Sequence, residues 1–133
     1  MKSKYPELRK LAMQYQKRAY SPYSKIKVGA AVEAKGELFG GCNIENMSYG
    51  GTMCAERVAI FKAVSENHKK ISKLYLYTKE GWPPCGLCLQ VMSEFMNPDD
   101  IVIAGSSKGE QIFKFKDLMP TPLDEEGYNK NKS

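Results

Sequence analysis

The sequence has no hydrophobic run long enough to cross a bilayer, so we expect no membrane-spanning helix. Residues 1–7 are polar and lack the apolar segment of a secretory signal peptide. These absences predict a cytoplasmic protein, in which thiols stay reduced. In that compartment a Cys-x-x-Cys motif is more often metal-binding or redox-active than a disulfide.

A basic stripe interleaved with aromatic side chains is also absent. The formal net charge of +5 comes from scattered lysines, with small clusters at residues 68–70 and 129–132. Proteins that bind nucleic acid usually gather Lys and Arg on one face or along one helix. We therefore expect that nucleic acid is not a partner of this protein.

Cysteine is scarce, but three of the four cysteines fall into two short motifs. The motifs are Cys54-Ala55-Glu56 and Pro84-Cys85-Gly86-Leu87-Cys88. Three thiolates with one open coordination position are typical of a catalytic zinc site, whereas four protein ligands close a structural one. Both motifs lie where a helix is predicted to begin, and the positive end of a helix dipole lowers the pKa of a thiol.

Two other interpretations of the Cys-x-x-Cys motif stay open. One is a thioredoxin-like redox pair, although Pro84 precedes the pair and a third cysteine belongs to a matching motif. The other is half of a four-cysteine zinc ribbon, although Cys42 is the only remaining cysteine and has no Cys-x-x-Cys partner. The joined motifs favour a catalytic zinc site over both.

Glu56 lies two residues after Cys54, where a proton carrier for a zinc-bound water is needed. Apolar residues around it favour a buried carboxylate over a solvated one. Burial raises the pKa of a carboxyl group and suits it to proton transfer near neutral pH. Arg57 is either a surface residue or a donor that partly neutralises the thiolates, and we favour the donor.

The length of 133 residues is enough for one domain with one core, and we find no internal repeat or linker. We assign residues 1–133 to a single domain with a loose tail from about residue 124. Periodicity and turn residues predict helices at 5–20, 53–66 (capped by Thr52) and 85–96, strands at 27–34, 37–44, 73–78, 101–104 and 111–115, and a short helix or turn at 117–123. This order predicts a three-layer α-β-α fold with a mixed sheet of about five strands.

Taken together, the motifs resemble the small, homotetrameric type of zinc-dependent cytidine deaminase, which acts on free nucleosides. A Cys or His, then x-Glu, then Pro-Cys-x-x-Cys is the general signature of zinc-dependent nucleobase deaminases. The resemblance runs from about residue 8 to residue 118. It rests on Ser21-Pro22-Tyr23-Ser24, Val28-Gly29-Ala30-Ala31, residues 43–50 (NIENMSYG), Cys54-Ala55-Glu56-Arg57 and residues 84–90 (PCGLCLQ).

The resemblance implies a fold like that of cytidine deaminase, a Zn²⁺ cofactor and a homotetramer with active sites shared between subunits. It also implies that Cys54, Cys85 and Cys88 bind the zinc. Zinc hydroxide would attack C4 of cytosine with Glu56 as the proton shuttle. The reaction would convert cytidine and deoxycytidine to uridine and deoxyuridine in pyrimidine salvage.

Substrate-binding roles follow from the same resemblance. Asn43 and Glu45 would hold the ribose hydroxyls, and residues two apart on a strand do point to one face. The alternative for both is a solvent-facing strand end. The backbone N–H of Ala55 would contact the base, and Tyr49 would reach a neighbouring subunit's site.

Three positions depart from the family pattern. Relatives often carry an aromatic residue at the position of Ile26 and an Arg at that of Leu89. Many also carry a Phe at the position of Leu123, where it stacks on the base from another subunit. Stacking is worth roughly 1–3 kcal/mol per base, so we expect weaker base binding or a different pyrimidine. Ile26 and Leu123 are therefore candidate substrate-binding residues.

The sequence leaves two alternative functions open. One is deamination of a modified cytosine nucleoside or of cytosine in nucleic acid. The other is a non-catalytic zinc domain used for assembly, in which Glu56 would have no purpose.

Overall fold

A five-stranded mixed sheet forms the centre of the computed structural model, which describes residues 2–125. The strand order is β2-β1-β3-β4-β5. The strands are β1 (Gly29–Ala34), β2 (Glu37–Cys42), β3 (Lys73–Tyr77), β4 (Ile101–Ser106) and β5 (Gly109–Lys114). Only β3 and β4 pair in parallel, and the other neighbours are antiparallel. The mixed five-stranded sheet predicted from the sequence is confirmed.

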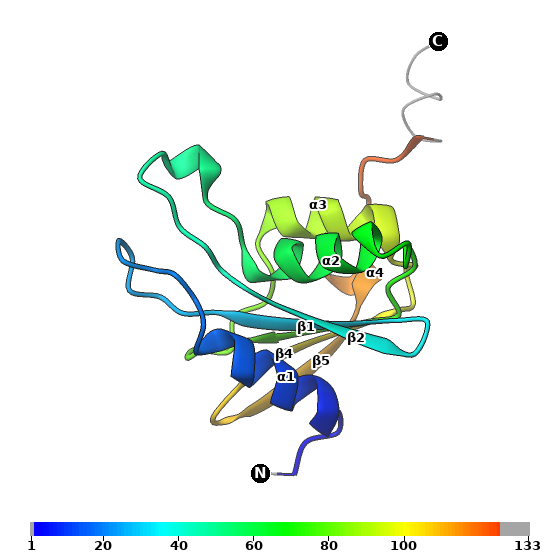
Figure 1. Cartoon of the computed structure of the whole chain (residues 1–133). Coiled ribbons are helices and arrows are strands. Elements are labelled where there is room, and N and C mark those ends of the chain that lie inside the picture. The colour runs from blue at the N-terminus through cyan, green and yellow to red at the C-terminus, as the bar shows by residue number, and fades with distance from the viewer. Residues whose placement is uncertain (1, 126–133) are drawn as a thin grey trace.

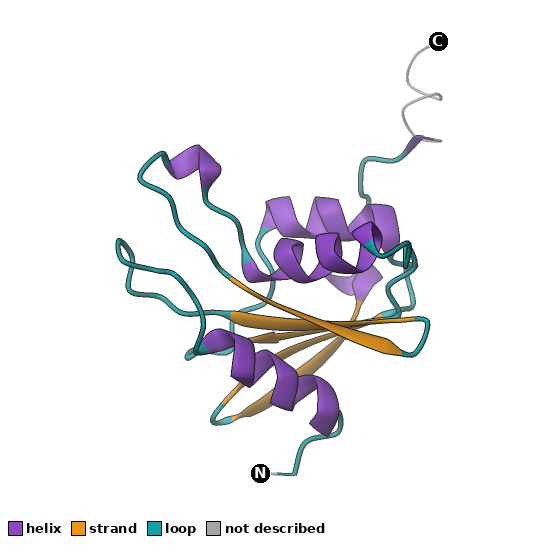
Figure 2. Ribbon diagram, in the orientation of Figure 1, coloured by secondary structure: helices purple, strands orange, loops and turns teal. Residues whose placement is uncertain are grey.

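Helices cover both faces of this sheet. Helix α1 (Pro6–Gln16) lies on one face, and α2 (Ala55–Ser65), α3 (Gly86–Phe95) and α4 (Phe115–Leu118) lie on the other (Figure 1). Figure 2 shows the resulting layers as helix, sheet and helix. The predicted three-layer fold is therefore confirmed. None of the helices in residues 2–125 has the length and apolar character needed to span a membrane.

Alternation along the central strands divides the core into two clusters. In β1, Ala30 packs with the α2–α3 layer, whereas the next residue, Ala31, packs with α1. In β3, Leu74 and Tyr75 divide in the same way. Successive side chains on a strand point to opposite faces. A strand buried on both faces therefore consists of consecutive apolar residues, as β4 does at residues 101–104.

Two adjacent glycines let a helix approach β2 closely on each face. A Cβ on Gly40 would lie 2.2 Å from the ring of Tyr15 in α1. A Cβ on Gly41 would lie 2.5 Å from the backbone nitrogen of Ala59 in α2. A side chain at position 40 would displace the Tyr15 ring, whereas one at position 41 would displace the backbone of α2. Gly41 therefore fixes the height of α2 above the sheet.

Two predicted elements are too long at their C-terminal ends. The first helix stops at Gln16 rather than residue 20, and β2 stops at Cys42 rather than residue 44. Thr52 does not cap α2, because the N-cap residue is Cys54. The Thr52 hydroxyl instead accepts a hydrogen bond from the backbone N–H of Asn46 and closes the loop before the helix. Most of the predicted loose tail, residues 126–133, lies outside the described residues.

A polar cluster joins the start of the chain to β5 on the α1 side of the sheet. The carboxylate of Glu110 accepts hydrogen bonds from the hydroxyls of Ser3 and Tyr75 and from the backbone N–H of Lys4. Arg9 donates to the Tyr75 hydroxyl at 2.8 Å. Hydrogen bonding lowers the pKa of Glu110 although its burial acts in the opposite direction. This Glu110 cluster holds α1 against the sheet.

Candidate metal centre and active site

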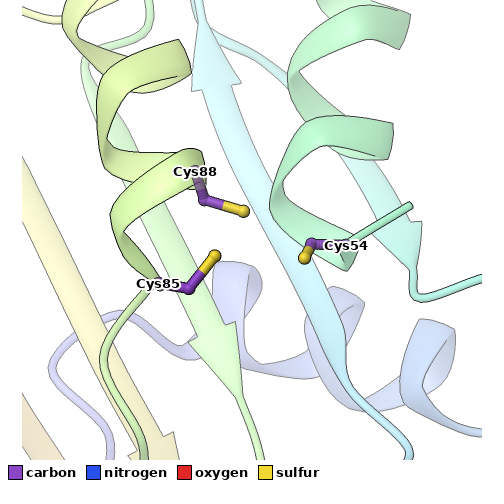
Figure 3. Close-up of side chains that lie close together, drawn as sticks. All are labelled: Cys54, Cys85 and Cys88. Carbon is purple, nitrogen blue, oxygen red and sulfur yellow. The ribbon is translucent and has the colours of Figure 1, made fainter. Parts of the chain in front are cut away.

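Three cysteine side chains meet where α2 and α3 begin (Figure 3). Cys54 is the N-cap residue of α2, Cys85 is the N-cap residue of α3, and Cys88 follows in the first turn of α3. Their three Sγ atoms lie within 4.8 Å of one another. Tetrahedral zinc with Zn–S bonds near 2.3 Å needs sulfurs about 3.8 Å apart. The three cysteines are therefore able to hold a zinc ion.

The surroundings of Cys54 favour its thiolate form. Hydrogen bonding from Cys88, then from Arg57, lowers the pKa of Cys54 to about 5 against the opposing effect of burial. The Nη2 atom of Arg57 donates to the Cys54 sulfur at 3.4 Å. The Nε atom of Arg57 is buried and finds no acceptor within residues 2–125. The guanidinium thus lies against the Cys54 sulfur and favours its negative charge.

Glu56 lies in a small cavity beside the thiolates. This metal-site cavity has a volume of about 210 Å³. Its lining residues are Val28, Asn43, Thr52, Met53, Cys54, Ala55, Glu56, Leu76, Thr78, Trp82, Pro83 and Cys85. Glu56 is only 4% exposed, and burial, followed by the charge of Cys54, raises its pKa to about 7. A carboxyl group with that pKa is suited to giving and taking protons at neutral pH.

Asn43 and Glu45 both reach toward the segment that follows α1, but they line different cavities. Asn43 accepts a hydrogen bond from the backbone of Val28 at 2.9 Å and donates to the Ile26 carbonyl at 2.7 Å, so its amide is fixed in the metal-site cavity. Glu45 accepts hydrogen bonds from the Ser24 hydroxyl and from the backbone N–H of Tyr23. Glu45 lines a neighbouring hollow.

The remaining predicted site residues divide between the cavity and the surface. Ala55 is buried in the metal-site cavity at the first position of α2. Tyr49 is 77% exposed and packs edge-on against Tyr23 beside Glu45. Leu123 is 70% exposed, and the Gln90 side chain bonds its backbone. Tyr49 and Leu123 therefore lie outside the metal-site cavity.

Ile26 also lies outside the metal-site cavity and lines a second cavity next to it. Thr78 and Trp82 line both cavities, and sequence reasoning missed the place of Trp82. Its signal was a lone tryptophan immediately before the Pro-Pro-Cys stretch. Sequence reasoning also missed Thr78, which directly follows β3 and accepts hydrogen bonds from the turn that carries Trp82.

Three clustered cysteines and a buried carboxylate at the start of two helices define a metalloenzyme of the hydrolytic type. Residues 2–104 match the family model described as the cytidine and deoxycytidylate deaminase zinc-binding region. The chain belongs to this zinc-binding deaminase family. The predicted fold, the zinc cofactor and the assignment to an enzyme are thereby confirmed.

Curated relatives support the assignment over nearly the whole chain. A protein named cytidine deaminase from Halalkalibacterium halodurans is 43% identical over 124 residues, which cover 90% of this chain and 94% of the relative. A protein of the same name from Sporosarcina psychrophila is 46% identical over 95 residues, which cover 69% of this chain and 70% of the relative.

Solved structures agree on the fold. The cytidine deaminase of Burkholderia pseudomallei superposes with a TM-score of 0.84 at 34% identity, and the match covers 91% of this chain and all of that one (100%). The cytidine deaminase of Mycobacterium tuberculosis gives a TM-score of 0.78 at 31% identity, with 92% and 99% of the two chains covered.

Proposed function

We propose that this protein catalyses the hydrolytic, zinc-dependent deamination of cytidine and deoxycytidine to uridine and deoxyuridine. The observation that carries the proposal is the buried carboxylate of Glu56 in one cavity with Cys54 and Cys85, two of the three clustered cysteines. A structural zinc domain has no need of a buried carboxylate beside its ligands. The family and the names of the relatives support the same reaction.

Cys54, Cys85 and Cys88 would hold the zinc ion, which supplies Lewis-acid activation of water near neutral pH. Addition of water at C4 of the pyrimidine and loss of ammonia require two kinds of proton movement. The first proton leaves the attacking water and reaches N3 of the ring. The second leaves the hydroxyl that has formed on C4 and reaches the departing amine, so that C4 becomes a carbonyl and ammonia is released. Glu56 performs both transfers, because its raised pKa allows it to be a base first and an acid afterwards.

Arg57 acts as a positioning residue in this scheme. Its guanidinium donates to Cys54 and partly neutralises the charge of the three thiolates. Relatives often carry a second Arg at the position of Leu89, so this chain relies on Arg57 for that role.

We assign the ribose hydroxyls to Asn43 and Glu45 and a base contact to the backbone N–H of Ala55. Asn43 lines the metal-site cavity and Glu45 lines the hollow beside it, so a nucleoside with its base near Glu56 would extend its sugar toward Glu45. A site built to bond a hydroxyl discriminates strongly against ligands that lack it. We expect free cytosine to be a poor substrate for this reason.

We further propose that the protein is a homotetramer with shared active sites. Tyr49 and Leu123 are exposed in the single chain. In a tetramer they would become part of a neighbouring subunit's base and sugar site. We place this single-domain enzyme in pyrimidine salvage in the cytoplasm, where thiols stay available to bind metal.

A direct assay tests the proposal. The zinc-loaded protein is incubated separately with cytidine, deoxycytidine and cytosine, and ammonia release is followed together with the loss of cytosine absorbance. We expect turnover of both nucleosides and little or none of the free base. A zinc-replete, folded protein that deaminates neither nucleoside would leave the assembly role of a non-catalytic zinc domain as the better explanation.

A further inference from the structure

Trp82 is the only tryptophan of the chain, and it lies at the border between two cavities. On one side it lines the metal-site cavity with Glu56 and Asn43. On the other it lines the second cavity, of about 510 Å³, with Ile26. It is 49% exposed, so a large part of the residue is free to meet a ligand.

The backbone fixes the position of Trp82. The buried hydroxyl of Thr78 accepts hydrogen bonds from the backbone N–H groups of Gly81, at 2.7 Å, and of Trp82, at 2.9 Å. Gly81 has a φ of +76°, which favours glycine and allows the turn. Pro83 and Pro84 then restrict the backbone up to Cys85. Trp82 is thus held between the end of β3 and a metal-binding cysteine.

One aromatic side chain lines the metal-site cavity among the described residues. Val28, Leu76 and Pro83 supply apolar walls, and Trp82 is the only aromatic residue among those described that line it. A pyrimidine is a planar π system, and aromatic side chains bind bases through their faces. Ile26, the position at which relatives often carry an aromatic residue, lines the second cavity only.

We propose that Trp82 determines substrate binding by stacking its indole on the pyrimidine ring. In this chain it would replace the aromatic contact that position 26 does not provide. The inference rests on the proposed function, because it takes the ring to be that of the nucleoside substrate. It adds a specificity residue that the family motifs do not contain.

The single tryptophan gives a direct binding signal. Fluorescence of the zinc-loaded protein is excited at the red edge of indole absorption, where nucleosides absorb little, during titration with cytidine, uridine and ribose. Stacking on the base predicts quenching by both nucleosides and none by ribose. A saturable turnover of cytidine with no change in fluorescence would overturn the inference.

Substitutions separate stacking from plain apolar contact. We expect Trp82→Leu and Trp82→Ala to raise KM for cytidine by roughly 5-fold to 150-fold, the range of one base–aromatic stack. Trp82→Phe should restore most of the binding, and kcat and zinc content should change little. Ile112→Ala removes another exposed apolar side chain, on β5, and serves as the control with unchanged KM. A KM for Trp82→Leu equal to that of Trp82→Phe would exclude stacking.

The two measurements also separate this inference from the proposed function. Quenching by nucleosides without turnover would refute the deaminase activity and support the stack. Turnover with unchanged KM in all three Trp82 variants would support the deaminase and refute the stack. If the protein showed neither turnover nor quenching, the deaminase activity and the stacking by Trp82 would both be refuted.

Discussion

Glu56 is the residue on which the chemistry depends. It is buried in the metal-site cavity and is not itself needed to hold the metal, because three cysteines are already placed to do so. We predict that Glu56→Gln keeps its zinc but loses about 10²–10⁴-fold in kcat, the usual contribution of a positioned acid–base group. Zinc analysis and single-turnover kinetics on the same sample check both parts.

The control for this change is Glu94→Gln, on the exposed surface of α3. Its activity should equal that of the unmodified protein. Full activity in Glu56→Gln with zinc still bound would show that another group moves the protons.

At the residue level, the motifs predicted the metal centre well because ligand chemistry restricts both residue type and spacing. Three thiolates and a nearby carboxylate leave few alternatives. The position of Trp82 at the cavity is harder to predict than the metal ligands, because it depends on a turn made by Thr78 and Gly81. Spacing in the sequence does not reveal such a turn.

Among the secondary-structure elements, α2 must be placed most accurately, because it carries both a predicted metal ligand and the predicted proton carrier. Its N-terminal end carries Cys54 and Glu56, and Gly41 of β2 allows it to lie close to the sheet. Gly41→Ala would place a Cβ 2.5 Å from the backbone nitrogen of Ala59 and push the helix away. We predict a loss of about 1–3 kcal/mol in the free energy of unfolding and a lower affinity for zinc.

Urea denaturation and zinc competition with a chelator measure these two effects. Gly50→Ala is the matched control, since a Cβ there meets nothing within 4 Å among the described atoms. Equal stability of Gly41→Ala and Gly50→Ala would mean that the helix adapts without cost.

The order of elements was predictable because helices and strands have different apolar periods and glycine marks the turns. The hairpin turn is an example, with positive φ at both Lys35 and Gly36. The segment between β2 and α2 was not predictable in the same way. Its course depends on isolated bridges of Ile44 with Tyr20 and with Met53, which join parts of the chain far apart in sequence.

For the whole molecule, assembly and activity should be linked. If Tyr49 serves a neighbouring site, dilution that separates the subunits will lower the specific activity. We expect size-exclusion chromatography with light scattering to give a tetramer, and Tyr49→Ala to reduce activity without loss of zinc. A stable monomer with full activity would contradict the shared site.

The Glu110 cluster makes the stability of the fold depend on pH. Since the folded-state pKa of Glu110 lies below its usual value of 4.5, the ionised carboxylate stabilises the fold above that pH. This contribution is lost as the pH falls through the folded-state pKa. We predict that Glu110→Gln is less stable at pH 7 and shows a shallower decline below about pH 4.5.

Urea midpoints at neutral and acidic pH test this prediction, again with Glu94→Gln as the control. A decline in acid that is equally steep in Glu110→Gln and in the unmodified protein would assign the pH dependence to other carboxylates.

The same cluster determines which side of the protein a surface attachment would cover. Ser3 and Lys4 are hydrogen-bonded to Glu110 on the α1 side, and Figure 1 shows α1 across the sheet from α2 and α3. A protein anchored to a bead or sensor chip close to Ser3 would therefore turn its α1 layer to the support. The layer of α2 and α3, which carries the three cysteines, would face away from the support.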